Sequence, residues 1–176
     1  YDQFGRFGGG DPCIMAHCVH SSDAEQELML RRGVYIAHSP ESNMNLASGV
    51  APVNQFIDRG LHVGLATDIA GGSHESMLRA MMHAIQASKL RWRLLDQSVK
   101  PLSFERAFYL ATMGGGQFFG KVGSFLDGYE LDAVVLDDAS LEHPQPLSAR
   151  ARLERMVYLA DERNIAAKFV SGRKIL

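Results

Sequence analysis

The fold is decided by residues 13–38, which read CIMAHCVHSSDAEQELMLRRGVYIAH. The first five and the last five of these residues are short apolar runs, and each run predicts a buried strand. Between the two runs, Ser22 and Glu25 have the spacing of a capping box, in which the serine oxygen accepts from a free backbone amide and the glutamate reaches back. Gly33 stands where a helix ends in a left-handed conformation that needs no side chain. The stretch therefore predicts a strand, a helix and a second strand.

The same alternation continues for one more unit. A loop is expected over Ser39–Ala51, after which Pro52 suits the first turn of a helix and Gly60 closes it. Leu61–Thr67 is the third apolar run and predicts a third strand. Since a parallel connection needs about the length of a helix, this alternation favours parallel strands covered by helices.

Beyond the third strand the pattern becomes helical and then β-rich. An amphipathic helix is expected at Glu75–Leu90, and Ser103 caps another helix through Phe104–Thr112. From Gly120 onward, glycines and short apolar runs indicate a smaller β-rich part. Its expected segments are strands at Ala133–Leu136, Lys168–Val170 and Lys174–Leu176, with a helix at Leu153–Leu159 between them.

Composition and charge exclude several classes of protein. The chain has 176 residues, of which 46% are hydrophobic and 22% charged, with a formal net charge of -2. These values exclude a collagen, a coiled coil and a disordered chain, and the low charge gives no reason to expect a nucleic-acid partner. No apolar run approaches the roughly 18 residues that span a bilayer, and the start lacks a signal-peptide pattern. We therefore expect no membrane contact. Because Cys13 and Cys18 lie too close for a disulfide framework, we also expect a cytoplasmic protein.

Each of the three predicted strands ends in a polar residue: His17, His38 and Asp68, respectively. In parallel α/β barrels the chemistry gathers at the carboxyl ends of the strands, because the loops that follow shape the mouth there. The structural alternative is that each histidine is merely hydrogen-bonded and that the aspartate caps a loop or a helix. The residues alone leave both interpretations open. The other histidines are assigned to structure or surface, namely His20, His62, His74, His83 and His143.

Two apparent motifs are rejected on spacing and context. Gly115–Lys121 resembles a phosphate-binding loop, but Val122 replaces the hydroxyl that binds the metal, and the stretch follows a helix instead of a strand. The dipeptide Pro12-Cys13 resembles the start of the cysteine pair in zinc deaminases of the cytidine type. The second cysteine, Cys18, stands at the wrong spacing, and no His-x-Glu precedes it. Neither motif supports a function.

Several longer stretches resemble one known group of enzymes, the metal-dependent deaminases of the amidohydrolase superfamily. The similarity covers nearly the whole chain and is to the second half of these enzymes. Within the group, the guanine deaminases match best, because of the late stretch Tyr-Leu-Ala-Asp-Glu-Arg-Asn-Ile. The matching stretches are Met15–Cys18, Ala37–Asn43, Gly64–Asp68, Asp68–Gly72, Ser76–Ala80, Gly123–Leu136 and Met156–Ile165.

The resemblance implies a specific fold. Residues 1–119 would be the C-terminal part of the (β/α)8 TIM-like barrel of a metal-dependent hydrolase, containing strands six to eight, and residues 120–176 would be part of a small β-rich composite domain. A barrel takes eight strands and typically about 250 residues, whereas the sequence predicts three parallel strands. We therefore expect the chain to be the C-terminal part of a larger enzyme, beginning between its fifth and sixth strands.

The resemblance also implies an activity and a site. The full-length enzyme would use one zinc ion per subunit to hydrolyse guanine to xanthine and ammonia. Asp68 matches the aspartate that binds zinc and contacts the attacking water, and His17 matches a histidine that hydrogen-bonds the water or the tetrahedral centre. Both residues would therefore be catalytic and contact the substrate, whereas His38 matches a position that is not normally a zinc ligand. Zinc lowers the pKa of its water to about 7, and a carboxylate can take the proton during the attack.

Several motifs of the group are missing from the chain. It contains neither the first-strand His-x-His pair nor the fifth-strand His-x-x-Glu, and the arginine and glutamine that read guanine would lie upstream. Because zinc has about four ligands, we expect an incomplete ligand set and an inactive isolated chain. By the resemblance we also expect a homodimer. Two alternatives remain open: a related amidohydrolase that deaminates or dechlorinates another heterocycle, or a non-catalytic piece that self-associates through open sheet edges.

Overall fold

The first half of the chain is built around a three-stranded parallel sheet. The computed structural model describes residues 1–176, and its strands β1 (Ile14–Ala16), β2 (Tyr35–His38) and β3 (His62–Leu65) run in the order β1-β2-β3. Both strand pairs are parallel, so the carboxyl ends of all three strands reach the same edge. The three predicted parallel strands are confirmed, although each is shorter than expected by one to three residues.

Helix α1 (Asp23–Arg32) connects β1 to β2 and has the predicted end signals. Ser22 Oγ accepts from the amide of Glu25, and the Glu25 carboxylate accepts from the amide of Ser22 over 2.7 Å. At the other end, Gly33 has a φ of 64°, in the left-handed region that glycine adopts without steric cost. The predicted capping box and C-cap are therefore confirmed.

The connection from β2 to β3 contains two short helices, α2 (Pro40–Asn45) and α3 (Val53–Asp58). The sequence predicts the second helix, but the loop expected over the first is wrong. Residues 40–45 are mostly polar and have no apolar period, so nothing in their pattern indicates a helix. The helix is favoured by Pro40 at its first position, where proline is preset to helical φ, and the side chains of Ser42 and Asn43 are buried against the rest of the fold.

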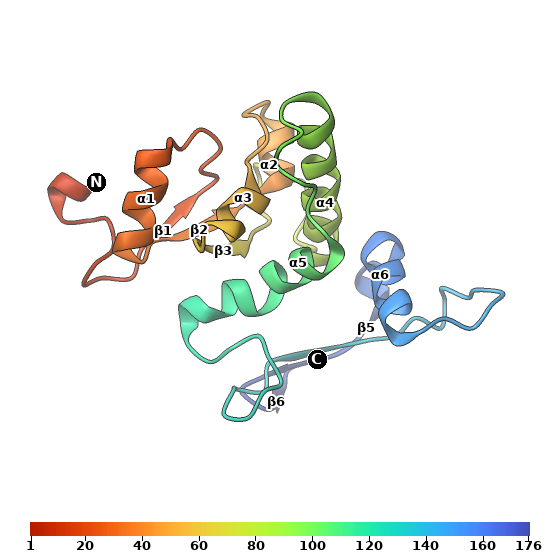
Figure 1. Cartoon of the computed structure of the whole chain (residues 1–176). Helices are drawn as coiled ribbons and strands as arrows, with labels where there is room; N and C mark the ends of the chain where they lie inside the picture. Colours follow the sequence, from red (N-terminus) through yellow and green to blue (C-terminus); the bar gives the residue numbers. More distant parts are fainter.

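The chain then forms a long helix and an interrupted one. Helix α4 (Met77–Leu94) begins two residues later and ends four residues later than predicted. Ser103 caps α5 (Phe104–Tyr109), as predicted, by accepting from an amide of the first turn. The helix does not continue regularly to Thr112, because a π-helical turn (Leu110–Gly114) follows directly. Figure 1 shows α4 beside α2, and the turn after α5 passes close to β3.

The hydrophobic core lies between the parallel sheet and its helices. Phe56 of α3 is fully enclosed, and Ile85 of α4 and Leu110 of the π-helical turn pack into the same cluster. Strands β2 and β3 contribute Ile36 and Val63. Each fully buried large apolar side chain contributes roughly 1.5–3 kcal/mol, so this cluster holds the sheet in place beneath its strand-end residues.

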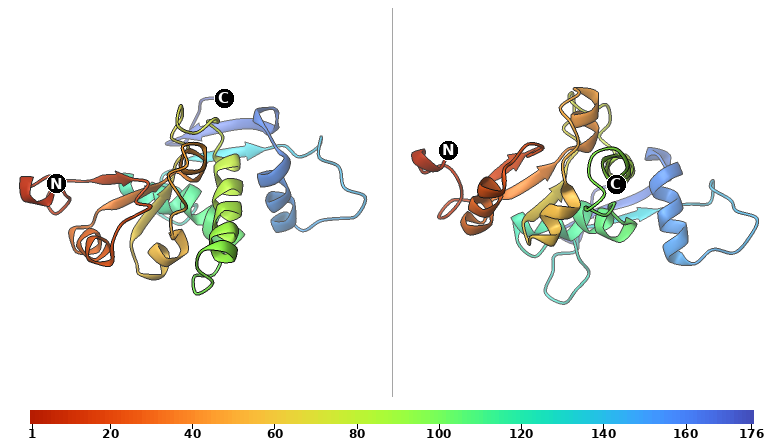
Figure 2. Two further views of the ribbon diagram at one scale, coloured as in Figure 1. Left: turned by 90° about the horizontal axis from the view of Figure 1, so that it is seen from above. Right: turned by 45° about the horizontal axis from the view of Figure 1, so that its top comes forward.

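The C-terminal part forms a second sheet, which is antiparallel and contains β4 (Ala133–Leu136), β5 (Ile165–Val170) and β6 (Arg173–Lys174). The strands agree with the expected β-rich texture, although β5 starts three residues earlier and β6 ends two residues earlier than predicted. Helix α6 (Ala149–Leu159) begins four residues earlier than predicted, because Ser148 caps it. Figure 2 shows this sheet in cyan and blue, with α6 next to α4.

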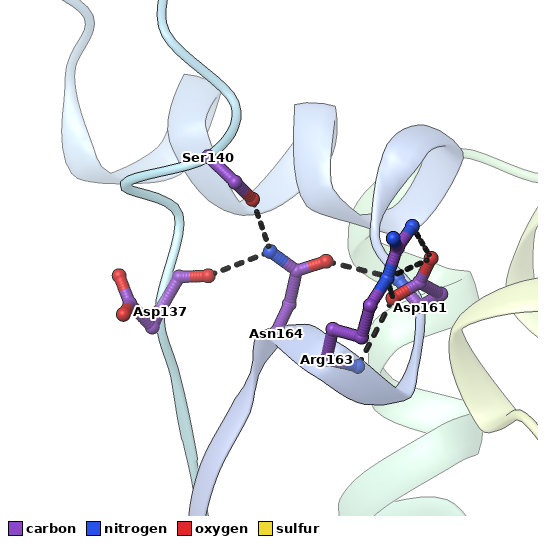
Figure 3. A network of polar contacts seen from close by, with 5 residues as sticks. All are labelled: Asp137, Ser140, Asp161, Arg163 and Asn164. Carbon is purple, nitrogen blue, oxygen red and sulfur yellow. Dashed lines mark hydrogen bonds and ion pairs between the residues drawn. The ribbon is translucent and has the colours of Figure 1, made fainter.

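A side-chain network closes the turn between α6 and β5 (Figure 3). Asn164 Nδ2 donates to the carbonyl of Asp137 over 2.8 Å and to Ser140 Oγ over 3.0 Å, and its Oδ1 accepts from the amide of Asp161. The Arg163 guanidinium hydrogen-bonds both carboxylate oxygens of Asp161 and lowers the pKa of that carboxyl to about 2. The network fastens the end of β4 to the start of β5.

Three single-turn 3-10 helices complete the structure, at Asp2–Phe4, Gln117–Phe119 and Glu162–Asn164. Both cysteines, Cys13 and Cys18, are free thiols. None of the helices combines the length and the apolar character that crossing a membrane requires.

A close backbone contact between glycines holds β3 against the π-helical turn. A Cβ added to Gly64 would lie 2.8 Å from the Cα of Gly115, and one added to Gly114 would lie 2.6 Å from the carbonyl oxygen of Val63. The glycines of this stretch therefore let two backbone segments approach closely, because no side chain separates them.

Replacing Gly64 by alanine should destabilise the fold by about 1–3 kcal/mol, because the added methyl group must push β3 and the π-helical turn apart. Chemical denaturation measures the free energy of unfolding. Gly10→Ala is the matched control, since nothing lies within 4 Å of a Cβ at that position. Equal stabilities of the two variants would contradict this packing.

Candidate active site

His17 stands at the carboxyl end of β1, one residue beyond the strand. Its amide donates to the carbonyl of Ala37 over 2.9 Å, so the ladder between β1 and β2 extends to this residue. Its φ of 65° lies in the left-handed region, where a non-glycine residue costs about 1–3 kcal/mol. Strain of this kind persists only where the surrounding structure enforces it, and it is concentrated at functional sites.

Asp68 follows β3 by three residues and has the same unusual backbone, with a φ of 49°. The loop then turns sharply, since the amide of Gly72 donates to the Asp68 carbonyl over 2.6 Å. Ala70 within this turn also has a positive φ, of 85°. The two predicted site residues thus both occupy left-handed backbone just after parallel strands.

The two side chains meet across the end of the sheet. His17 Nε2 lies 3.7 Å from Asp68 Oδ2, and the two side chains are 39% and 41% exposed. A nitrogen and an oxygen at this separation are placed to contact one small group between them, such as a water molecule. The structure therefore brings together the two residues that sequence reasoning selected, and leaves both accessible.

His38, the third polar strand end, has a different environment. It is 2% exposed, and neither ring nitrogen has a hydrogen-bond partner. Burial, with a smaller effect from the nearby His17 ring, lowers the pKa of His38 to about 4. Partly exposed and buried residues alternate along β2, and His38 lies on its buried face together with Ile36.

Helix α2 holds both partners of the pair, and sequence reasoning missed its contacts. Asn43 Oδ1 lies 2.8 Å from His17 Nδ1, and Asn45 Nδ2 donates to the carbonyl of Gly71 over 2.8 Å. Ser73 of the same loop donates its hydroxyl to the Glu41 carboxylate. The available signal was the Pro40 that starts a helix immediately after a strand, together with the polar residues that follow it.

Gly71 allows the loop after Asp68 to lie directly on α2. A Cβ added at this position would stand 2.6 Å from Ser42 Oγ and 2.8 Å from Asp68 Oδ2. Any side chain here would displace either the helix or the carboxylate. The position of the Asp68 carboxylate therefore depends on a glycine at position 71.

Glu41 is part of the scaffold of this loop. Burial raises the pKa of its carboxyl, but the hydrogen bond from Ser73 and the nearby His83 outweigh this effect and hold the pKa below its ordinary value. His83 Nδ1 lies 3.7 Å from Glu41 Oε2, and both side chains are largely buried. His74 lies within 2.6 Å of the Arg79 guanidinium. The two histidines therefore contact scaffold groups, in agreement with their expected structural assignment.

The residues of the chain do not by themselves form a zinc site. No three side chains of histidine, cysteine, aspartate or glutamate come together in a way that could hold a metal ion, whereas zinc in proteins has about four ligands. His17 and Asp68 supply only two donor atoms. The nearby Cys18 thiol hydrogen-bonds the carbonyl of Met15, and burial raises its pKa.

The sequence matches the Amidohydrolase family over residues 6–175, and the chain therefore belongs to this family. The guanine deaminase of Dictyostelium discoideum is 34% identical over 169 residues, which cover 92% of this chain and 37% of that protein. The crystal structure of a guanine deaminase from C. acetobutylicum, with guanine bound in its active site, has a TM-score of 0.94 and 45% identity, covering 100% of this chain and 42% of that chain. An adenosine deaminase from Xanthomonas campestris with bound zinc has a TM-score of 0.81 and 26% identity, covering 99% of this chain and 39% of that chain.

These similarities confirm the resemblance inferred from the sequence, since guanine deaminases are homologues of the chain. The mixed α/β fold of the family is confirmed as well. The chain spans between 37% and 42% of the length of the three proteins.

The buried His38 should make the stability of the fold depend on pH. Its pKa is about 4 in the folded state and about 6.5 in an unfolded chain, so between these values the unfolded state binds more protons. The free energy of unfolding should therefore fall as the pH is lowered from about 6.5 to about 4, by up to about 3 kcal/mol. Denaturation at several pH values measures this slope.

Two variants isolate the contribution of His38. His38→Leu removes the buried titrating group and should flatten the slope. His143→Gln removes a histidine that lies on the surface and should leave it unchanged. If His38→Leu kept the wild-type slope, the pH dependence would have to come from other groups.

Proposed function

We propose that the whole protein to which this chain belongs catalyses the zinc-dependent hydrolysis of guanine to xanthine and ammonia. The proposal is carried by one observation: His17 and Asp68 meet at 3.7 Å, in strained backbone at the ends of parallel strands. The relatives named above, among them a guanine deaminase with guanine in its active site, support the substrate.

We also propose that β1, β2 and β3 are strands six to eight of a (β/α)8 barrel, so that residues 1–119 belong to the barrel. The supporting argument is topological. After β3 the chain adds no further strand to the parallel sheet and passes through helices to an antiparallel sheet of its own. Residues 120–176 would then be part of a small β-rich composite domain.

Asp68 and His17 have distinct roles in this proposal. Asp68 is the residue of this chain that would hold zinc, the metal would supply a polarised water, and the Asp68 carboxylate would accept a proton from that water. His17 hydrogen-bonds the water or the tetrahedral centre through Nε2, and both residues contact guanine. The remaining zinc ligands would come from parts of the protein outside these residues, since only two donors meet here. The isolated chain would accordingly be inactive.

The setting of the enzyme follows from the same resemblance. We propose a cytoplasmic homodimer that acts on the purine as a free small molecule. The free thiols of Cys13 and Cys18 suit a reducing compartment. The near-neutral charge suits a small-molecule substrate better than a nucleic acid.

A second candidate is a related amidohydrolase that acts on another amino-substituted heterocycle. The similarity to an adenosine deaminase favours this alternative, because a carboxylate and a histidine can serve the loss of ammonia from either purine. A non-catalytic, self-associating piece is the candidate from another class. It is supported by apolar side chains exposed on the second sheet, such as Val134, Val135 and Val170.

A substrate panel tests the proposed reaction directly. The full-length protein should release ammonia from guanine with a higher kcat/KM than from adenine, adenosine, cytosine or an aminotriazine, and removal of zinc by a chelator should abolish the activity. Ammonia release and product absorbance are the measurements. A preference for any other member of the panel would overturn the substrate, and activity without metal would overturn the zinc requirement.

Substitutions of Asp68 and His17 should separate their two roles. In the full-length protein, Asp68→Ala should lose both zinc and nearly all turnover, because it removes a ligand and a proton acceptor. His17→Ala should retain zinc and lower kcat by about 10²–10³-fold, as expected when one hydrogen bond to the reacting centre is lost. Metal analysis alongside steady-state kinetics gives both readouts. Wild-type zinc content in Asp68→Ala, or loss of zinc in His17→Ala, would show that the roles are assigned wrongly.

A further inference from the structure

We propose that Asn43 is a positioning residue, which fixes the ring of His17 so that its Nε2 atom faces Asp68 as a hydrogen-bond acceptor. This inference rests on the function proposed above, in which His17 and Asp68 act on the same water molecule. It adds a residue of α2 that touches neither the substrate nor the metal.

Asn43 lies directly behind the His17 ring. Its Oδ1 atom is 2.8 Å from His17 Nδ1, while the opposite ring nitrogen, Nε2, is 3.7 Å from Asp68 Oδ2. Asn43 is 2% exposed, whereas the His17 side chain is 39% exposed. The asparagine is therefore fixed in the interior, and the histidine reaches outward from it.

The contact selects one tautomer of His17. A neutral imidazole carries its proton on one nitrogen and accepts on the other, and the amide oxygen of asparagine can only accept. In the neutral ring, His17 Nδ1 therefore carries the proton and donates a hydrogen bond to Asn43 Oδ1, which leaves Nε2 with its lone pair. With that lone pair, Nε2 can accept from the attacking water beside Asp68, which is one of the two roles proposed for His17 above.

The backbone gives the two residues little freedom to move apart. The amide of Asn43 donates to the Ser39 carbonyl over 3.1 Å, and its carbonyl accepts from the amide of Ser48 over 2.8 Å. The amide of His17 donates to the carbonyl of Ala37 over 2.9 Å. The main chain and the ring of His17 are thus both held by the segment that contains β2 and α2.

The asparagine does not satisfy its own hydrogen-bonding groups. Its Nδ2 atom is buried and has no hydrogen-bond partner, although buried polar groups are normally paired and each exception calls for an explanation. A leucine, of similar size, would remove the unpaired amide, but it would offer no acceptor to His17 Nδ1. The side chain therefore serves the histidine ring and not the packing of the core.

The test combines spectroscopy and kinetics on the full-length protein. ¹⁵N NMR of histidine-labelled protein, at a pH well above the ordinary imidazole pKa of about 6.5, reads which nitrogen of His17 carries the proton. We expect Nδ1 in the wild type and in Asn43→Asp, which keeps the acceptor, and loss of this preference in Asn43→Leu. With guanine as substrate, Asn43→Leu should lower kcat by about 10- to 100-fold with little change in KM, and Asn43→Asp should restore most of kcat.

Asn54→Ala is the matched control. Asn54, in α3, is also buried and hydrogen-bonds the carbonyl of Lys100 and the guanidinium of Arg106. Replacing it therefore removes buried hydrogen bonds that do not involve His17. It should keep the wild-type tautomer and kcat. A wild-type His17 protonated at Nε2, or equal kcat values for Asn43→Leu and Asn54→Ala, would overturn the role of Asn43. If the wild-type protein did not hydrolyse guanine, the proposed function would fail, while the tautomer measurement would still decide for or against Asn43.

Discussion

The candidate site depends on the parallel arrangement of β1, β2 and β3. Because the three strands run in one direction, the residues that follow them emerge at one edge of the sheet. Strands β1 and β3 are not neighbours, so His17 and Asp68 can meet only across the end of β2. The left-handed backbone at both residues turns the chain sharply at that edge, which an ordinary extended continuation of the strands would not do. Reversing one outer strand would place the two side chains at opposite edges.

Helix α2 fixes the spacing between His17 and Asp68. It contacts His17 through Asn43 and the Asp68 loop through Asn45 and Glu41, so one short element sets both members of the pair. This arrangement leaves polar atoms unpaired in the interior: Ser42 Oγ and both ring nitrogens of His38 are buried without hydrogen-bond partners. Buried polar groups of this kind oppose folding, and departures from local rules of stability are typical of functional sites. Stability and placement of the site are therefore in conflict within the same few residues.

The sequence predicts those features that depend on local patterns. Three parallel strands and the cap at Ser22 follow from apolar runs and capping residues. The rule for strand ends indicates three polar residues, and the resemblance selects His17 and Asp68 among them, which lie 3.7 Å apart. The helix over residues 40–45 escapes prediction because its buried residues are polar, and its contacts join segments that are distant in the sequence. The local pattern alone does not distinguish His38 from His17, which only the resemblance separates. Both end a strand, but His38 lies on the buried face of β2 with Ile36, whereas His17 lies one residue beyond β1 in left-handed backbone.

The late stretch on which the resemblance to guanine deaminases is based has a structural role in this chain. Asp161, Arg163 and Asn164 hydrogen-bond one another and the end of β4, closing a turn in the second sheet (Figure 3). A motif that fixes a turn identifies a family through its packing and carries no information about the heterocycle. The polar groups that remain accessible at the ends of the parallel strands are the carboxylate of Asp68 and the imidazole of His17, and the proposed deamination depends on them.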